Sequence, residues 1–294
     1  MNNEPLRSPL VDSLLARCTF PTPGTPADCA VSGGPDSMAL LVLAVAHGLD
    51  VTAVHVDHSI RPGSARDAEL IAPVAARLGA KFVTRTVTVE PGPHLEARAR
   101  QARFAALPPG SMTGHTADDQ AETVLINLLR GAGTAGLSAM EPGTAHPLLA
   151  LRREETHALC RELGITTVHD ETNDDPAHQR NRVRSELLPL LATISRRDPV
   201  PILVRTADVM RDDGALLDEL ASQIDPTDAP ALAAAPLPLA RRAVRQWLAH
   251  PYPPDQATVE RVLEVARGRV PGCDIGGNRQ IRRSKQRMTI VDLG

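Results

Sequence analysis

The chain of 294 residues is longer than one typical domain, and its formal net charge of −3 gives it no overall attraction to polyanions. Aromatic residues make up only 2% of the chain, which argues against a protein that grips single strands by stacking bases on rings. The four cysteines form no C-x-x-C pair, and the longest apolar run, residues 38–46, is too short to span a membrane. We therefore expect a soluble cytoplasmic protein with reduced thiols, no membrane contact and only a local surface for nucleic acid.

Strands and helices alternate through the first half of the chain. Residues 1–27 are expected to be an N-terminal extension with one short amphipathic segment and a Pro-rich connector. Strands are then predicted within DCAVSGG, DVTAVHVDH, KFVTRTVTV and GSMTGHT, each followed by a helical pattern. This alternation predicts an α/β domain over residues 28–196, with a parallel sheet and helices on both faces. The strand ends at Ser32, near Asp57 and at His115 should converge on one ligand site.

Helical patterns take over from about residue 150. After Pro199 and Pro201 the stretch ILVRTADVMRDDGALLDELASQI predicts one long amphipathic helix. Two shorter helices are predicted within PLPLARRAVRQWLAH and DQATVERVLEVARG. Residues 197–294 are therefore expected to form a small, mostly helical domain.

The loop SGGPDS at residues 32–37 joins the first strand to its helix. Its glycines, two hydroxyls and helix N-terminus suit an anion, but it lacks the Lys of the common phosphate loop and carries Asp36 instead. A bare carboxylate beside phosphates would repel them, so a bridging Mg²⁺ with Asp36 as its ligand is the simplest resolution. The alternative is an ordinary tight turn in which Asp36 interacts with the helix dipole.

A second group of acids lies at the start of the helix ADDQAETVLINLLRG. Asp119 and Glu122 are three residues apart, share a face, and follow His115 closely. Two acids aimed into a nucleotide cleft would bind a cation. Acids in the first turns of a helix can instead be dipole partners, and His115 can be a buried histidine with a hydrogen bond at a strand end.

Five motifs in chain order resemble one family. These are SGGPDS, HVDHSIR, ARQARFAAL, TGHTADDQAETVLINLLRGAGTAGLSAM and DETNDDPAHQRNRVRSELLPLL. The first is similar to the signature of PP-loop ATP pyrophosphatases, and the set together resembles tRNA(Ile)-lysidine synthetases over most of residues 28–191. The resemblance implies a Rossmann-like PP-loop fold, ATP and Mg²⁺ as cofactors, and AMP and pyrophosphate as products. It also implies lysine ligation, through an adenylated intermediate, to C2 of the wobble cytidine in tRNA(Ile) with a CAU anticodon.

The same resemblance implies roles for individual residues. Asp36, His115, Asp119 and Glu122 would be catalytic, Asp36 would hold the metal, and Asp119, Glu122 and Arg180 would bind lysine. The nucleotide would contact ten residues: Ser32, Gly33, Gly34, Pro35, Asp36, Ser37, Asp57, His58, Arg100 and Arg103. Because only neutral lysine amine attacks carbon, one of the acids or His115 must accept a proton, and the sequence does not decide which.

Basic residues supply two expected tRNA contacts. One is Arg182 and Arg184, and the other is Arg282 and Arg283 in an arginine-rich C-terminal segment. Local salt bridges or solvated arginines are the alternative.

The chain departs from the family at Thr116, where a second His is common, and at His146, where Arg is common. His146 could bind an anion only at acid pH. Another PP-loop ligase that modifies RNA, or a non-catalytic nucleotide sensor, remains an alternative function, and a homodimer is one option for assembly.

Overall fold

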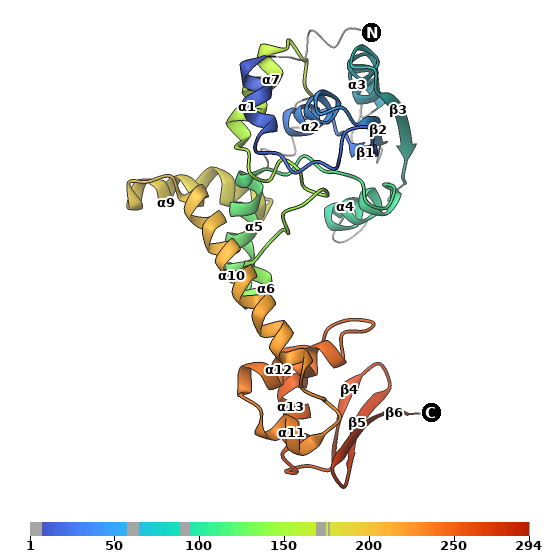
Figure 1. Ribbon diagram of the computed structural model, residues 1–294, viewed down its shortest axis with the longest axis vertical. Coiled ribbons are helices and arrows are strands. Elements are labelled where there is room, and N and C mark those ends of the chain that lie inside the picture. Colours follow the sequence, from blue (N-terminus) through green and yellow to red (C-terminus); the bar gives the residue numbers. More distant parts are fainter. Residues whose placement is uncertain (1–7, 58–64, 89–94, 169–174, 176, 294) are drawn as a thin grey trace. The chain divides into compact units, whose positions relative to one another are not determined.

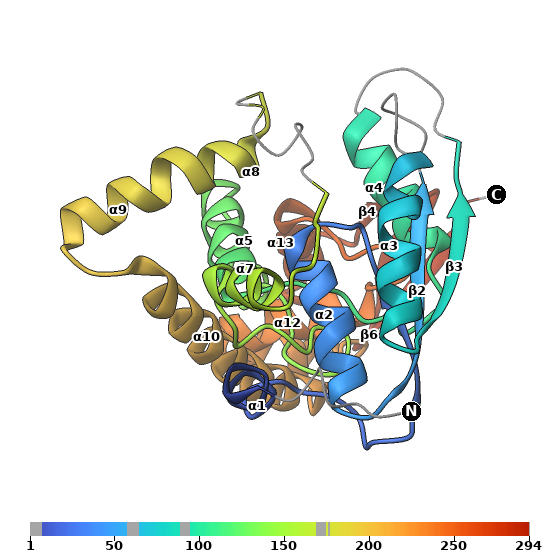
Figure 2. The same cartoon turned by 90° about the horizontal axis from the view of Figure 1, so that it is seen from above.

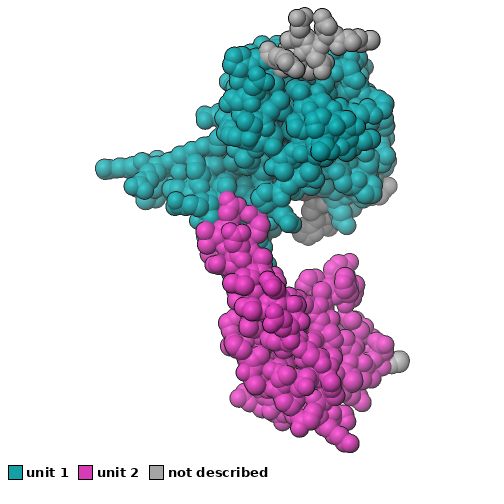
Figure 3. Space-filling view, in the orientation of Figure 1, with its two compact units in different colours: residues 1–207 teal, residues 208–294 magenta. Residues whose placement is uncertain are grey.

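Two compact units make up the protein, at residues 1–207 and 208–294 (Figure 3). They are seen in a computed structural model that describes residues 8–57, 65–88, 95–168, 175 and 177–293. Each unit has a hydrophobic core of its own. In the described part of the chain, no helix is both long and apolar enough to cross a bilayer.

The first unit contains a parallel sheet, with β3 at its outer edge (Figure 1). Its strands are β1 (Pro26–Ala30), β2 (Asp50–Asp57) and β3 (Lys81–Thr86). The middle strand β2 pairs with β1 and β3, and the register places Ala53 opposite both Cys29 and Phe82. Five of the eight residues of β2 are buried, as expected for a strand covered on both faces.

The fourth expected strand is reduced to a single bridge. Met112 pairs in parallel with Cys29, and its backbone exchanges hydrogen bonds with Asp28 and Ala30. The turn at residues 108–111 precedes it and Gly114 follows it, which leaves little chain for a longer ladder.

Helices cover both faces of the sheet. The described part of the first unit contains, before α10, the helices α1 (Pro9–Leu15), α2 (Pro35–Ala46), α3 (Ala65–Arg77), α4 (Leu95–Ala106), α5 (Ala117–Leu129), α6 (Thr134–Leu137), α7 (Arg153–Glu162), α8 (Gln179–Arg182), the π-helical turn η3 (Val183–Leu187) and α9 (Leu188–Ser195). The chain moves from β1 to β3 in one direction and returns across the sheet to Met112. With right-handed crossovers, α2 and α3 cover one face and α4 the other. The predicted α/β architecture is confirmed.

Helix α2 is the centre of the first core. Every residue from Ser37 to Val45 is buried, because α1, α7 and the sheet surround this helix. Such a helix is apolar all round. Each of its leucines contributes about 2 kcal/mol through removal from water. The packing fixes the N-terminus of α2, and with it the loop at residues 32–37.

The second unit contains helices and an antiparallel sheet. Helix α10 (Pro199–Ser222) begins in the first unit and ends in the second. Three helices follow, α11 (Ala229–Ala234), α12 (Leu237–Trp247) and α13 (Gln256–Ala266), and then three strands, β4 (Gly272–Gly276), β5 (Arg279–Ser284) and β6 (Arg287–Asp292). The strands form a meander in the order β4–β5–β6.

Helices α10, α12 and α13 were predicted, but α11 and the sheet were not. Within β5 and β6 only Ile281 and Met288 are buried, so the alternation that marks a strand is almost hidden among arginines. The two turns, at residues 276–278 and 285–286, carry Asn278 and Lys285 at positive φ. Hairpin turns of this kind are a local signal for a meander.

Candidate active site

The loop at residues 32–37 is a compact turn tied by its two serines. The Ser32 N–H donates to Ser37 Oγ at 3.1 Å, and the Ser37 hydroxyl donates to the Gly34 carbonyl at 2.8 Å. Gly34 is the N-cap of α2, and Pro35 occupies the first helical turn without losing a hydrogen bond. The free amides of this helix N-terminus are suited to an anion.

Two glycines allow other segments to approach the loop closely. Gly33 has a φ of +87°, and a Cβ there would lie 2.6 Å from the Val168 side chain. A Cβ on Gly114 would lie 2.6 Å from the backbone oxygen of Asp36. The segment TGH at residues 113–115 therefore passes directly against the loop, which brings the strand end at His115 to Asp36 as predicted.

The Asp36 carboxylate is held by side chains from α7. Its Oδ1 accepts a short hydrogen bond from the Thr156 hydroxyl, and its Oδ2 lies 3.6 Å from Arg153 Nε. His157 Nε2 is 4.0 Å from Oδ1. Burial raises the pKa of Asp36 to about 6, and the negative charge of Asp119 acts in the same direction.

Three arginines surround the buried acids of α5. Glu122 is fully buried and accepts from Arg153 at 3.0 Å, from Arg180 at 2.7 Å and from Arg184 at 2.7 Å. Asp119 Oδ1 accepts from Arg153 and Arg180, each at 3.0 Å. Burial alone raises the pKa of Asp119, but Arg153 and Arg180 outweigh it and hold the pKa well below its ordinary value.

Thr116 explains one departure from the family pattern. This residue is fully buried at the N-cap of α5, and both its N–H and its hydroxyl donate to Asp119 Oδ2 at 2.9 Å. The other carboxylate oxygen of Asp119 already bonds two arginines. In place of a second histidine, the chain has a residue that fixes Asp119.

The sequence predicted two acids, Asp119 and Glu122, that bind a cation, but in the structure these acids are already paired with arginines. Three carboxylates, on Asp36, Asp119 and Glu122, face three guanidinium groups, on Arg153, Arg180 and Arg184. We call these six groups the carboxylate–arginine cluster. An incoming ammonium group would meet a compensated network, so it could join the acids only by exchanging with an arginine.

His115 and His146 share one hydroxyl. Thr113 Oγ1 lies 2.7 Å from Nδ1 of His115 and 2.8 Å from Nδ1 of His146, and the two rings pack edge to face. The same hydroxyl also lies 3.3 Å from the Ala145 carbonyl, and because a hydroxyl has one proton and two lone pairs, it can donate to only one of these three partners. Burial lowers the pKa of His146, so His146 is not a cation at neutral pH in place of the usual Arg.

The α7 residues of the site were missed from the sequence. Arg152 and Arg153 occupy the N-cap and first position of α7, where the helix dipole disfavours cations. Arg152 bonds Asp118, and Arg153 bonds Asp36, Asp119 and Glu122. Two adjacent arginines at a predicted helix start therefore indicate that acids from another segment lie nearby, because such acids offset the unfavourable interaction with the helix dipole.

Of the remaining residues expected to contact the nucleotide, the structure describes only some. Asp57 is the last residue of β2 and pairs with Thr86 at the end of β3, while His58 lies outside the described residues. Arg100 and Arg103 lie on α4, and their side chains are outside the described part.

The four arginines expected to contact tRNA have different surroundings. The Arg184 guanidinium bonds Glu122 within the carboxylate–arginine cluster, whereas Arg182 pairs with Glu186 on the surface. Arg282 is exposed on β5. Arg283 donates to the carbonyls of Ala266 at 2.7 Å and Lys285 at 3.0 Å, so it joins the last turn of α13 to the β5–β6 hairpin.

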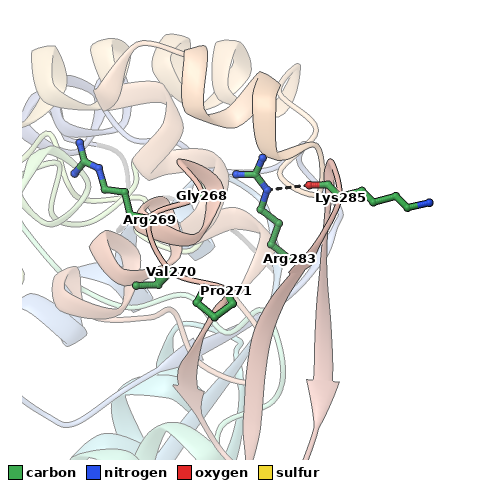
Figure 4. Close-up of a pocket in the computed structure, with 6 residues that line it drawn as sticks. All are labelled: Gly268, Arg269, Val270, Pro271, Arg283 and Lys285. Carbon is green, nitrogen blue, oxygen red and sulfur yellow. Dashed lines mark hydrogen bonds between the residues drawn. The ribbon is translucent and has the colours of Figure 1, made fainter.

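A basic cavity lies next to Arg283 in the second unit. It has a volume of about 430 Å³ and is lined by Gly268, Arg269, Val270, Pro271, Arg283 and Lys285 (Figure 4). Arg269 is paired with Glu264, while Lys285 extends away from the strand. Arginine and lysine around an apolar floor are suited to a phosphate ester rather than to a cation.

Comparisons with known proteins assign the chain to a family. Residues 24–191 match the PP-loop domain model, and residues 228–289 match the TilS substrate binding domain model. The tRNA(Ile)-lysidine synthase of Rhodococcus erythropolis is 43% identical over 235 residues, which cover 74% of this chain and 72% of that one. The chain belongs to the tRNA(Ile)-lysidine synthase family.

Other relatives agree with this assignment. The tRNA(Ile)-lysidine synthase of Nocardia farcinica is also 43% identical and covers 74% of each chain. Among solved structures, the U34-tRNA thiolase NcsA from Methanococcus maripaludis has a TM-score of 0.54 at 16% identity, over 71% of this chain and 79% of that one. At this identity the likeness shows a shared fold and nothing more. The resemblance expected from the five motifs is confirmed.

Proposed function

We propose that this member of the family ligates lysine to C2 of the wobble cytidine in CAU-anticodon tRNA(Ile), using ATP. The proposal rests on the ion pairs that join Asp36, in the loop at 32–37, to the rest of the carboxylate–arginine cluster through Arg153. Helix α7, which carries Arg153, lies alongside α2 (Figure 2). A second domain of a substrate-binding type in the same chain supports an RNA substrate. The reaction has two steps, adenylation of the cytidine oxygen and displacement of AMP by lysine.

The first step needs a cradle for the leaving pyrophosphate. The N–H groups of Gly33, Gly34 and the first turn of α2 would supply fixed donors, because Pro35 has no N–H and the Ser32 N–H already bonds Ser37. We assign the nucleotide contacts to Ser32, Gly33, Gly34 and Ser37, with Asp57 at the end of β2. Donors that are fixed before the reaction stabilise the charge that develops on the leaving group.

A magnesium ion fits this site as an ion held mainly by the nucleotide. Asp36 offers one carboxylate, and among the described residues no group of three His, Cys, Asp or Glu side chains is arranged as a metal cage. Magnesium commonly takes one or two protein carboxylates, with phosphate oxygens and water completing its shell. When bound, it neutralises phosphate charge. We assign its single protein ligand to Asp36.

The second step needs lysine with a neutral amine. We assign lysine to Asp119, Glu122 and Arg180, where its ammonium would exchange with an arginine of the cluster. The Thr113–His115 pair is a route for a proton, because the hydroxyl links His115 to a second imidazole. Which group removes the proton stays open between His115 and the acids.

RNA would be held by surfaces outside this cluster. We assign Arg182, Arg282 and Lys285, which is at the edge of the basic cavity, to phosphate contacts, because these three side chains are exposed. With tRNA as substrate, we expect the protein to act in the cytoplasm. A homodimer stays a prediction, which sedimentation analysis tests.

Sulfur transfer is not favoured as an alternative reaction. Burial raises the pKa of Cys18, Cys29 and Cys160 to about 12 in each case, so none of these thiols is a ready nucleophile.

A product assay tests the proposal. With tRNA(Ile), lysine and ATP, AMP and pyrophosphate should accumulate together, and omission of tRNA should abolish both. Asp36→Ala should remove adenylation, whereas Asp12→Ala on α1, which also changes an acid in a first turn, should leave it intact. ADP as product, or full turnover without Asp36, would contradict the scheme.

A further inference from the structure

Helix α7 presents one face to the first turn of α2. Arg153, Thr156, His157 and Cys160 are spaced at i, i+3, i+4 and i+7, so they form a single stripe. All four contact Pro35 or Asp36. We call these residues the α7 stripe.

The stripe holds both oxygens of the Asp36 carboxylate. Thr156, which is fully buried, donates its hydroxyl to Oδ1, and Arg153 lies 3.6 Å from Oδ2. The Thr156 hydroxyl is also 2.8 Å from the Arg153 carbonyl, so its single proton is shared between this carbonyl and the Asp36 carboxylate. Cys160 Sγ donates to the Pro35 carbonyl at 3.3 Å, immediately before the acid.

Two different partners on two oxygens fix the plane of the carboxylate. A carboxylate in the first turn of a helix is otherwise free to rotate about its terminal bond. Thr156 orients the carboxylate and, as a donor to it, also favours its charged form, whereas Arg153 is shared with Asp119 and Glu122 and contributes charge to the whole cluster. A hydrogen bond to a buried charged group is among the stronger ones.

We propose that Thr156 is a positioning residue, which sets the orientation of the Asp36 carboxylate toward the metal–nucleotide complex. This rests on the proposed assignment of the metal to Asp36. It predicts that Thr156 affects the binding of ATP with Mg²⁺ and leaves the binding of ATP without metal unchanged. A purely structural residue would affect both to the same extent.

The test is calorimetric titration of ATP, with Mg²⁺ and with EDTA, into the full chain. Thr156→Val should weaken ATP binding about tenfold in Mg²⁺ and by less than about twofold in EDTA. Thr156→Ser, which keeps the hydroxyl, should bind ATP in Mg²⁺ about as tightly as the unaltered chain. Thr206→Val is the matched control, because the Thr206 hydroxyl also bonds a carbonyl of its own helix but lies on the surface of α10.

Other results would overturn the proposal. A positioning role would be contradicted if Thr156→Val bound ATP in Mg²⁺ as tightly as the unaltered chain. It would also be contradicted if the affinity for ATP fell equally in Mg²⁺ and in EDTA. Thr156→Ala removes the hydroxyl without adding a methyl next to the carboxylate, so it decides the matter if the valine variant does not fold. If the variants behave as expected but no lysine is transferred to tRNA, the proposed function fails while the role of Thr156 stands.

Discussion

Glu122 is the residue on which the balance of charge in the site depends most. It is fully buried and accepts from three arginines. Removal of one partner from a buried ionic network leaves uncompensated charge, which costs far more than the loss of a surface pair. Glu122→Gln should therefore lower the free energy of unfolding by about 3 kcal/mol.

Chemical denaturation measures this effect, with Glu186→Gln as control. Glu186 also pairs with an arginine from the same segment, but that pair is solvent-exposed. The control should leave the unfolding midpoint nearly unchanged. Equal effects of the two substitutions would show that the cluster is not a buried network.

His146 should make stability depend on pH below neutrality. Burial lowers the pKa of His146 in the folded protein, so protons bind preferentially to the unfolded chain. The contribution is fully present above the unfolded pKa of about 6.5 and is lost as the pH falls further. His146→Gln should flatten the fall in unfolding free energy between about pH 7 and pH 5. Parallel curves for the variant and the unaltered protein would contradict this expectation.

The functional groups of the site were predictable only in part at this scale. Asp36, Asp119 and Glu122 stand in recognisable motifs, so the sequence named them. Their partner Arg153 is more than 30 residues from Asp119 and comes from a helix of another pattern. The pairing of an acid with an arginine far away in the sequence depends on the tertiary structure, so the spacing of residues within one motif does not predict it.

At the scale of elements, the close passage of the segment TGH past the loop at 32–37 is the critical contact. A Cβ on Gly114 would lie 2.6 Å from the oxygen and 2.8 Å from the carbon of the Asp36 carbonyl. Backbone cannot yield as a flexible side chain does, so Gly114→Ala should shift the loop. We expect ATP affinity to fall at least about tenfold, because small displacements of a binding loop are costly.

Gly133→Ala is the control for that substitution. Gly133 is also in the first unit, has a negative φ, and has nothing within 4 Å of an added Cβ. Its ATP affinity should match that of the unaltered chain. If Gly114→Ala binds ATP equally well, the two segments are not in firm contact.

Elements with a long apolar pattern were predicted well, and those whose apolar pattern is interrupted by charged residues were not. Helix α2 and strand β2 are long apolar patterns, and both formed where expected. Strand β5 buries only Ile281, so charge obscured its alternation. The strand at Met112 shrank to one bridge, since neighbouring turns limit its length.

At the scale of the whole molecule, two neighbouring arginines of the second unit should behave differently. Arg282 is exposed, so Arg282→Ala should weaken tRNA binding and reduce the salt dependence of the affinity by about one counterion. Arg283 bonds carbonyls of α13 and of the β5–β6 turn, so Arg283→Ala should instead lower the melting temperature. Filter binding at several salt concentrations and thermal melting separate the two. The same phenotype for both would contradict the assignment.

Transfer of lysine to a cytidine of tRNA can be observed in the product itself. The measurement is mass spectrometry of nucleosides from tRNA(Ile) with a CAU anticodon, after incubation with the protein, ATP and lysine. We expect a cytidine that carries lysine at the wobble position, formed only when ATP, lysine and an intact Asp36 are all present. Unmodified cytidine under those conditions, or a sulfur-containing product, would contradict it.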